Sequence, residues 1–317
     1  MAMITEAWVN PYYEELELVF AEASDAVSRF PGQLASAGLA YMNKFNPLLA
    51  DSTNNYICYL LPYWIRDTSG IPLEQCRKLS IANVFGMLHY FLLDDVIDAP
   101  SVSQGVRTQL ALGSLLYEEL LERYRELFPS TSPFWTYAKS YTTEWAEGTV
   151  NESSHNYFIT SPISVAKKSA PLKMSSTGAL LLGGQESLVA ELSQAVDCVL
   201  LALQMCDDWA DWEEDLQDGS YNSLIAMVGA EYPGVEVDAQ LVRNAIYVKG
   251  ILGRYVAVLR EEALLFPSST RLIELFSYYQ YLVRYLSDHA RSTQNNLQRL
   301  KHGGLHMLLS NLGESSC

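Results

Sequence analysis

Two short stretches of the sequence concentrate carboxylates at the ends of apolar segments. The first, FLLDDVIDAP, carries Asp94, Asp95 and Asp98 and follows residues 81–93, in which only His89 could acquire a charge. On a helix Asp94 and Asp98 lie one turn apart on the same face, where like charges repel by roughly 0.2–0.5 kcal/mol. The pair therefore sits above an apolar, partly aromatic wall, made of Phe91, Tyr90, Met87 and Val84.

The second stretch is QMCDDWADWEEDLQDG, which holds seven acidic residues and no basic residue between Asp207 and Asp218. Asp207, Asp211 and Asp215 recur every fourth residue and so form one column on a helix. The preceding turns are again apolar, with Leu203, Leu200 and Val196 below the column. Either run taken alone is more simply interpreted as a solvated acidic helix end.

Taken together, the two carboxylate columns suggest a metal-dependent site. If they face each other they need a counter-charge, and Mg²⁺ prefers oxygen ligands, keeps several waters and bridges carboxylates to substrate phosphates. The sequence thus predicts Mg²⁺ between two acidic walls, a polyphosphate at the rim and an apolar cavity beneath. Such a site suits an amphiphile with a diphosphate head and a hydrocarbon tail.

The elements that must position these residues read as helices throughout. Residues 111–128 place their leucines on one stripe with Glu and Arg opposite, which is the pattern of an amphipathic helix. In almost no stretch do apolar and polar residues alternate for long enough to form a strand. We therefore expect one all-α domain spanning 1–317. The expected helices cover 4–29, 33–47, 52–66, 72–96, 101–128, 133–150, 160–183, 186–218, 221–230, 236–266, 268–299 and 301–312. Pro171 should break or kink the helix in which it falls.

Composition narrows the class of protein. The 317 residues carry 21 Lys and Arg against 37 Asp and Glu, a net charge of −16, which argues against a nucleic-acid-binding surface. No basic, apolar secretory leader is evident, and no run reaches the roughly 18 uncharged apolar residues of a membrane span. Five cysteines without a CxxC pair indicate reduced thiols. We therefore expect a cytoplasmic protein without stable membrane insertion.

These motifs resemble those of the class I isoprenoid synthases. DDVID (94–98) matches their DDxxD motif, and DDWADWEED (207–215) resembles both the second DDxxD of chain-elongating prenyl diphosphate synthases and the NSE/DTE metal motif of terpene cyclases. KSAPL, beginning at Lys168, is similar to the KT(A/G)xL segment whose lysine binds diphosphate, and Arg284-Tyr285 is similar to the arginine–tyrosine pair of cyclases. The resemblance covers residues 80–290 and implies a single-domain helical bundle around a central apolar cavity.

The resemblance also implies roles for individual residues. It implies a cofactor of three Mg²⁺ ions, held by Asp94, Asp95, Asp98, Asp207, Asp211 and Asp215. The diphosphate would contact Lys168, Arg284 and Tyr285, with Lys167 and Lys173 as competitors of Lys168. Aromatic faces can stabilise a carbocation, and the substrate's tail would contact Phe91, Met87, Tyr90, Leu200, Leu203 and Trp209. Homodimers are common in this superfamily, so a homodimer is also possible.

The departures from the family favour cyclisation over chain elongation. Chain-elongating synthases bind a second diphosphate through a basic N-terminal segment and an RRG after the first motif. Here the basic residues between positions 30 and 66 are only Lys44 and Arg66. The segment APSVSQGVRTQ after the first motif contains a single basic residue, Arg107. We therefore expect a terpene cyclase acting on geranylgeranyl or farnesyl diphosphate, with a prenyl diphosphate synthase as the alternative. A non-catalytic helical binding protein is a third hypothesis. The sequence leaves the substrate open among chains of 15, 20 and 25 carbons.

Overall fold

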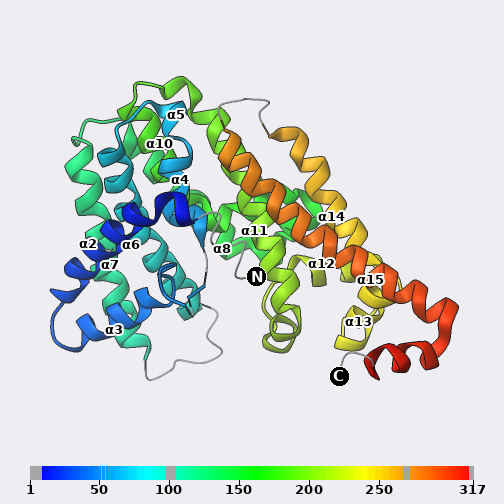
Figure 1. Ribbon diagram of the computed structural model, residues 1–317. Coiled ribbons are helices and arrows are strands. Elements are labelled where there is room, and N and C mark those ends of the chain that lie inside the picture. The colour runs from blue at the N-terminus through cyan, green and yellow to red at the C-terminus, as the bar shows by residue number, and fades with distance from the viewer. Residues whose placement is uncertain (1–8, 51, 54, 98–104, 267–271, 314–317) are drawn as a thin grey trace. The chain divides into compact units, whose positions relative to one another are not determined.

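The computed structural model describes residues 9–50, 52–53, 55–97, 105–266 and 272–313, and for Ser153, Leu265 and 300–313 it describes the backbone alone. Every regular element in these ranges is an α-helix or a short 3₁₀-helix (Figure 1). The prediction of an all-α fold is therefore confirmed.

The helices group into two compact units, each assembled from separated parts of the chain. Unit 1 comprises Met1–Ala146, Ser169–Val196 and Ser268–Leu275, and unit 2 comprises Glu147–Lys168, Asp197–Pro267 and Phe276–Cys317. Helices α8 (Phe134–His155), α11 (Val189–Asp218) and α15 (Ile273–Gly313) contribute residues to both units. The expectation of one domain over 1–317 stays a prediction.

Unit 1 is built around α6 (Leu73–Ile97), which packs against α2, α4, α7 and α10 (Figure 1). From Leu79 to Leu88 every residue of α6 is buried, as expected for a helix that is apolar on all sides. The acidic end of α6 is thus carried on a helix whose middle is completely buried. The other elements of unit 1 are η1 (Asn10–Tyr12), α2 (Tyr13–Ser28), α3 (Gln33–Asn43), α4 (Tyr56–Trp64), α5 (Arg66–Ser69), α7 (Val106–Leu127), α10 (Lys173–Leu182) and η3 (Glu186–Leu188).

Unit 2 contains the greater part of α11, from Asp197 to its end. Helices α12 and α13 contact each other, α14 contacts both, and α12 also packs against α9. The bounds in this unit are α9 (Tyr157–Thr160), α12 (Ser223–Glu231), α13 (Ala239–Tyr247), α14 (Ile251–Glu262) and η4 (Ala263–Leu265), and the 3₁₀-helix η2 (Pro162–Leu172) runs from unit 2 into unit 1.

The structure contradicts two of the expected helix boundaries and confirms one expected helix break. The single helix expected over 236–266 is wrong: α13 ends at Tyr247 and α14 starts at Ile251, because Gly250 takes a φ of +69° that favours glycine. The separate helices expected over 268–299 and 301–312 are also wrong, since α15 is continuous. The break expected at Pro171 is confirmed, because the chain there is 3₁₀-helical and becomes α-helical only at Lys173.

Two helices, Leu73–Ile97 and Glu186–Asp218, are long and apolar enough to cross a membrane by length and composition alone. More than half of the apolar window of each lies inside the protein. The core helix of a soluble protein passes the same test, so these two helices are weak evidence for a membrane span. Four described cysteines, Cys58, Cys76, Cys198 and Cys206, are free and buried.

Candidate active site

The first acidic motif forms the last turn of α6 in unit 1. Asp94 is half-buried and Asp95 is exposed, while Asp98 lies outside the described residues. The hydroxyl of Tyr41, on α3, donates a hydrogen bond of 3.0 Å to Asp95 Oδ2. Burial raises the pKa of Tyr41, and the charge of Asp95 raises it further. The tyrosine therefore stays a proton donor to this carboxylate.

The apolar face below this motif is largely packed against neighbouring aromatic rings. Met87 and Tyr90 are buried, and the Tyr90 ring meets Trp145 edge-on at 5.1 Å. Phe91 is only half-buried and meets Phe45 of the α3–α4 connection edge-on at 5.3 Å. Of the three predicted tail-binding residues in this unit, Phe91 is the most exposed.

The second acidic motif forms the last three turns of α11 in unit 2. Asp207 and Asp211 are exposed and Asp215 is half-buried. Asp207 keeps solvent contact, yet enclosure by the protein, together with the carboxylates of Asp208 and Asp211, raises its pKa to about 7. Such crowding of negative charge is relieved when a cation binds.

Asp208 differs from the three aspartates of this column. Its side chain is buried, and its carboxylate accepts hydrogen bonds from Gln204 Nε2, from the Ser223 backbone N–H and from the Ser223 hydroxyl. Burial raises its pKa to about 6 although these donors lower it. Asp208 is therefore occupied by contacts within the protein, whereas Asp207 and Asp211 face solvent.

The donor set of the two motifs fits a hard divalent cation, since it consists of carboxylate oxygens. Among the described side chains, no three His, Cys, Asp or Glu residues gather closely enough to hold a metal ion on their own. A cation at either motif would thus take one or two carboxylates and complete its shell with water and substrate oxygens, which is the usual pattern for Mg²⁺.

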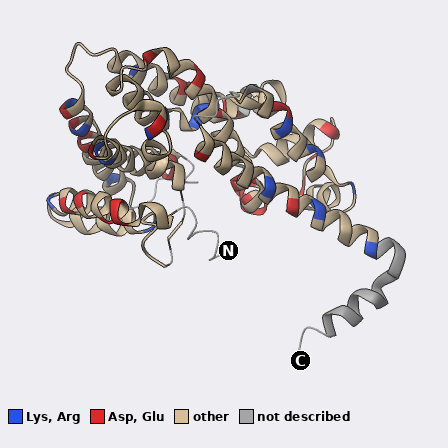
Figure 2. Ribbon diagram, turned by 45° about the horizontal axis from the view of Figure 1, so that its top comes forward, with Lys and Arg blue, Asp and Glu red and all other residues tan. Residues whose placement is uncertain are grey.

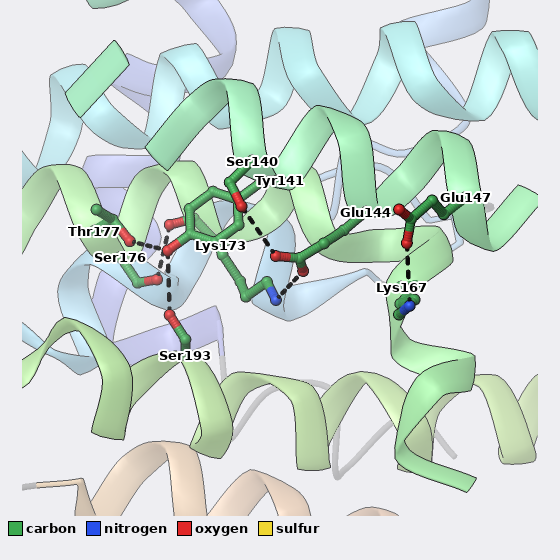
Figure 3. Close-up of polar contacts among 9 residues, drawn as sticks. All are labelled: Ser140, Tyr141, Glu144, Glu147, Lys167, Lys173, Ser176, Thr177 and Ser193. Carbon is green, nitrogen blue, oxygen red and sulfur yellow. Dashed lines mark hydrogen bonds and ion pairs between the residues drawn. The ribbon is translucent and has the colours of Figure 1, made fainter. Parts of the chain in front are cut away.

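The three lysines that the sequence left as competitors each pair with a glutamate of α8. Lys167 Nζ lies 3.2 Å from Glu147 Oε2, and Lys173 Nζ lies 2.7 Å from Glu144 Oε2, as Figure 3 shows. Lys168 Nζ lies 3.0 Å from Glu152 Oε2. The lysines differ in exposure: the side chain of Lys173 is 4% exposed, that of Lys168 18% and that of Lys167 32%.

Lys173 is held by more than its ion pair. Its ammonium lies 5.0 Å from the centre of the Tyr141 ring, and the Tyr141 hydroxyl bonds Thr177 Oγ1 at 2.7 Å and Ser193 Oγ at 3.2 Å (Figure 3). These contacts lie in unit 1, whereas Lys167 and Lys168 belong to unit 2 with the second acidic motif. Lys173 is therefore part of the core of unit 1, whereas Lys167 and Lys168 both keep exposed surface in unit 2.

A glycine on α8 allows the lysine segment to approach closely. A Cβ atom at Gly148 would lie 2.9 Å from both the Cβ of Lys167 and the backbone N of Lys168. Real Cβ atoms do not show such separations, so only glycine fits without displacement. Gly148 thus lets η2 pack closely against α8 and fixes the position of the backbone from which the side chains of Lys167 and Lys168 extend.

The arginine–tyrosine pair lies on α15 in unit 2. Arg284 is exposed, and the half-buried ring of Tyr285 meets His289 edge-on at 4.7 Å. The imidazole of His289 also lies 5.6 Å from Trp209 of the second acidic motif. The structure thereby brings Tyr285 and α11 together through His289. The predicted tail-binding residues Leu200, buried, and Leu203, half-buried, lie further back on α11.

The sequence interpretation did not identify His289, Glu152 or Asn222 as site residues. Asn222 is buried and donates from Nδ2 to Asp215 Oδ2 at 2.8 Å. Its signal in the sequence is Asn-Ser ahead of the apolar run LIAMV, which is the pattern of a helix N-cap. His289 and Glu152 carry no comparable signal: the contact of His289 with Trp209 and the ion pair of Glu152 with Lys168 each join residues of different elements.

No protein-family model and no curated protein matches this chain. Solved structures that are similar to it include the following two. One is geranylgeranyl pyrophosphate synthetase from the archaeon Geoglobus acetivorans, with a TM-score of 0.63 and 17% identity over 87% of this chain and 98% of that one. The other is polyprenyl synthase IspB from Roseobacter denitrificans, with a TM-score of 0.64 and 12% identity over 90% of this chain and all of that one. The chain therefore has the all-α fold of the class I isoprenoid synthase type.

Proposed function

We propose that this protein is an enzyme that binds a linear prenyl diphosphate with Mg²⁺ and breaks its allylic carbon–oxygen bond. The observation that carries the proposal is the content of unit 2. On a fold of the isoprenoid synthase type, this unit holds the column Asp207, Asp211 and Asp215 together with Lys168 and the Arg284-Tyr285 pair. Carboxylates for a metal and cationic donors for a diphosphate are the groups that such a reaction requires.

Each group has a defined task in this proposal. Mg²⁺, when bound, neutralises the charge that develops on the departing diphosphate. Lys168 donates hydrogen bonds from its ammonium to the same oxygens, and Glu152 orients that ammonium before substrate arrives. Arg284, exposed on α15, offers a planar fork of donors that suits phosphate oxygens. Asp94 and Asp95 are the proposed metal ligands of unit 1.

The experiment that tests the proposal measures release of inorganic diphosphate. Purified protein is incubated with Mg²⁺ and, separately, with linear diphosphates of 15, 20 and 25 carbons. We expect release with at least one of them and loss of about 10²-fold or more in Asp207→Asn. Absence of release from all three substrates would contradict the proposal and favour the non-catalytic binding protein.

The similar solved structures support chain elongation as the reaction that follows formation of the allylic cation. Both solved structures bear the names of prenyl diphosphate synthases, and they align over nearly their whole length. In this version the double bond of isopentenyl diphosphate attacks the cation and forms a carbon–carbon bond. The new carbocation then loses a proton, and a longer prenyl diphosphate results. This requires a second site for an anionic substrate.

The scarcity of basic residues that could bind a second diphosphate supports cyclisation instead. Of the bases that flank the first motif in the sequence, Lys44 lies over the Tyr41 ring at 5.3 Å, and Arg66 and Arg107 are exposed. Arg77 is already held by Glu15 through two hydrogen bonds of 2.8 Å. Within the described ranges, these residues form no basic cluster for a second diphosphate, and a single substrate would then cyclise on itself.

One experiment separates the two fates. The allylic diphosphate that releases diphosphate is supplied alone and then with isopentenyl diphosphate, and products are analysed by mass spectrometry. A pentane-extractable hydrocarbon or alcohol from the single substrate supports cyclisation. Product that forms only with isopentenyl diphosphate, and that retains a diphosphate, supports chain elongation.

A further inference from the structure

The turn between α11 and α12 carries a buried polar network behind the second acidic motif. Asn222 is 2% exposed and Ser223 is fully buried. Asn222 Nδ2 donates both to the backbone carbonyl of Asp208 and to Asp215 Oδ2, each at 2.8 Å. Its Oδ1 accepts the backbone N–H groups of Leu224 and Ile225 and so caps α12. One amide therefore joins two turns of α11 to the start of α12.

The network is fixed at its base by Asp208. The buried carboxylate holds the Ser223 backbone N–H at 2.8 Å and also binds the Ser223 hydroxyl. That hydroxyl meets the Tyr255 hydroxyl at 2.6 Å, and Tyr255 donates to the backbone carbonyl of Met205 at 3.2 Å. Because every member has a partner, the backbone at Asn222 has little freedom to move.

The turn is fixed on its other side as well. Tyr221 donates to Asn156 Oδ1 at 2.9 Å, and its hydroxyl accepts the Phe158 backbone N–H at 3.2 Å. Asn156 takes a φ of +44° between α8 and α9, a conformation that costs energy for a non-glycine residue. Tyr221 therefore anchors the turn to the segment that leads to Lys168.

We infer that Asn222 is a positioning residue that sets the orientation of the Asp215 carboxylate and thereby the divalent-cation affinity of the second acidic motif. The inference rests on the proposed function, because it takes Asp215 to be a metal ligand. Asn222 itself offers no atom to the cation, since its Oδ1 caps α12 and its Nδ2 is a donor. Partners that orient a metal ligand typically affect affinity by about 10–100-fold.

Asn222→Ser separates positioning from capping. Serine is nearly as good an N-cap as asparagine, so the start of α12 is kept, but its hydroxyl cannot make the bonds to both Asp208 and Asp215. The matched control is Asp238→Ser, because Asp238 caps α13 in the same unit by accepting the Leu241 backbone N–H at 2.7 Å. Both variants replace an N-cap residue by serine, but only Asn222 contacts the second acidic motif.

The experiment titrates the proteins with Mn²⁺ and follows the free ion by electron paramagnetic resonance. We expect Asn222→Ser to bind Mn²⁺ about 10–100-fold more weakly than wild type, and Asp238→Ser to bind within about twofold of it. In turnover, Asn222→Ser should require more Mg²⁺ for half-maximal rate but recover most of kcat at saturation. Should Asn222→Ser not fold, Asn222→Gly, which also caps helices, replaces it.

The outcomes separate this inference from the proposed function. Unchanged Mn²⁺ affinity in Asn222→Ser, with wild-type protein binding Mn²⁺ and releasing diphosphate, overturns the inference alone. Equal weakening in Asn222→Ser and Asp238→Ser also overturns it, since the effect would then be one of stability. Wild-type protein that neither binds Mn²⁺ nor releases diphosphate overturns both.

Discussion

The three lysines near η2 illustrate how burial separates residues of the same type. A buried charge is tolerated only when it is paired and hydrogen-bonded, and Lys173 meets that condition through Glu144 and the Tyr141 ring. Lys168 is paired too, but its side chain keeps 18% exposure. An ammonium in that position can turn from its glutamate to a phosphate oxygen without being pulled from the core.

The first prediction at this scale concerns substrate binding. Lys168→Met should lower kcat/KM for diphosphate release by about 10²-fold, because a donor to the leaving group is lost. Lys167→Met is the matched control: the same substitution on the neighbouring residue, whose ion pair with Glu147 is more exposed, should change kcat/KM by about twofold or less. Steady-state diphosphate release measures both variants, and equal losses in the two would argue against a specific role of Lys168.

The second prediction concerns the buried pair. Glu144→Gln leaves the Lys173 ammonium buried without its carboxylate and should cost about 3–5 kcal/mol of unfolding free energy. Lys173→Met should cost less, because Glu144 keeps 31% exposure of its side chain and can be solvated. Urea unfolding of the two variants measures the difference, and a larger loss in Lys173→Met would show that the lysine's packing outweighs its charge.

At the scale of elements, the sequence predicted the helices well and their interruptions less well. Apolar periodicity located α6, α7 and α11 within a few residues, because each buries a continuous face. The break at Gly250 was missed since the apolar pattern continues across it, and only the backbone reveals the positive φ. The continuity of α15 was missed because Gly303-Gly304 weakens a helix without ending it.

The sequence likewise predicted part of the candidate site, namely the residues that share one face of a helix. The four-residue spacing separates Asp207, Asp211 and Asp215 from Asp208, and the structure places Asp208 in the core. The partners of the lysines were not predictable, since Glu144, Glu147 and Glu152 meet them only once α8 folds back along η2. Spacing along one helix can be read from a sequence, but contacts between helices depend on packing.

Gly148 allows a prediction about these packed elements. Gly148→Val would force one β-carbon and two γ-carbon atoms into the space now filled by the Lys167 side chain and the Lys168 backbone. We expect a loss of about 1–3 kcal/mol in unfolding free energy, as for overpacking, together with a lower kcat/KM because Lys168 is displaced. Gly229→Val is the control, since a Cβ there meets only Val237 at 3.5 Å; urea unfolding and diphosphate release measure both.

The ion pair that joins α2 to α6 predicts a pH dependence of stability. Two hydrogen bonds from Arg77 hold the pKa of Glu15 below its ordinary value, although burial opposes them. A carboxyl with a lowered pKa stabilises the folded state above its unfolded pKa and loses that contribution as the pH falls through the folded pKa. Glu15→Gln should therefore cost about 1–3 kcal/mol at pH 7 and progressively less below about pH 4. Urea unfolding at several pH values checks this, and a constant difference would contradict it.

The charge of the whole molecule bears on how an anionic substrate can bind. With 37 acidic and 21 basic residues, the protein's net field opposes a diphosphate. In the part of the chain that the structure describes, Lys and Arg are spread over many helices rather than gathered on one (Figure 2). Lys168 and Arg284 can donate to a diphosphate, but they do not balance the carboxylates of the acidic motifs. Under the proposed function we therefore expect a divalent cation to enter with the substrate, and metal and diphosphate to bind cooperatively.

Cooperative binding predicts a change in the stability of the folded protein. A ligand that binds only the folded state stabilises it by about 2.7 kcal/mol at one hundred times its dissociation constant, which is roughly 3–5 °C in Tm for a chain of this size. Mg²⁺ with inorganic diphosphate should produce such a rise, whereas Mg²⁺ alone, or diphosphate with a chelator, should produce much less. Calorimetry of wild type and Asp207→Asn tests this, because the variant should lose most of the rise. Stabilisation by diphosphate alone would instead mean that Lys168 and Arg284 suffice to hold the anion, and the acidic motifs would then need another explanation.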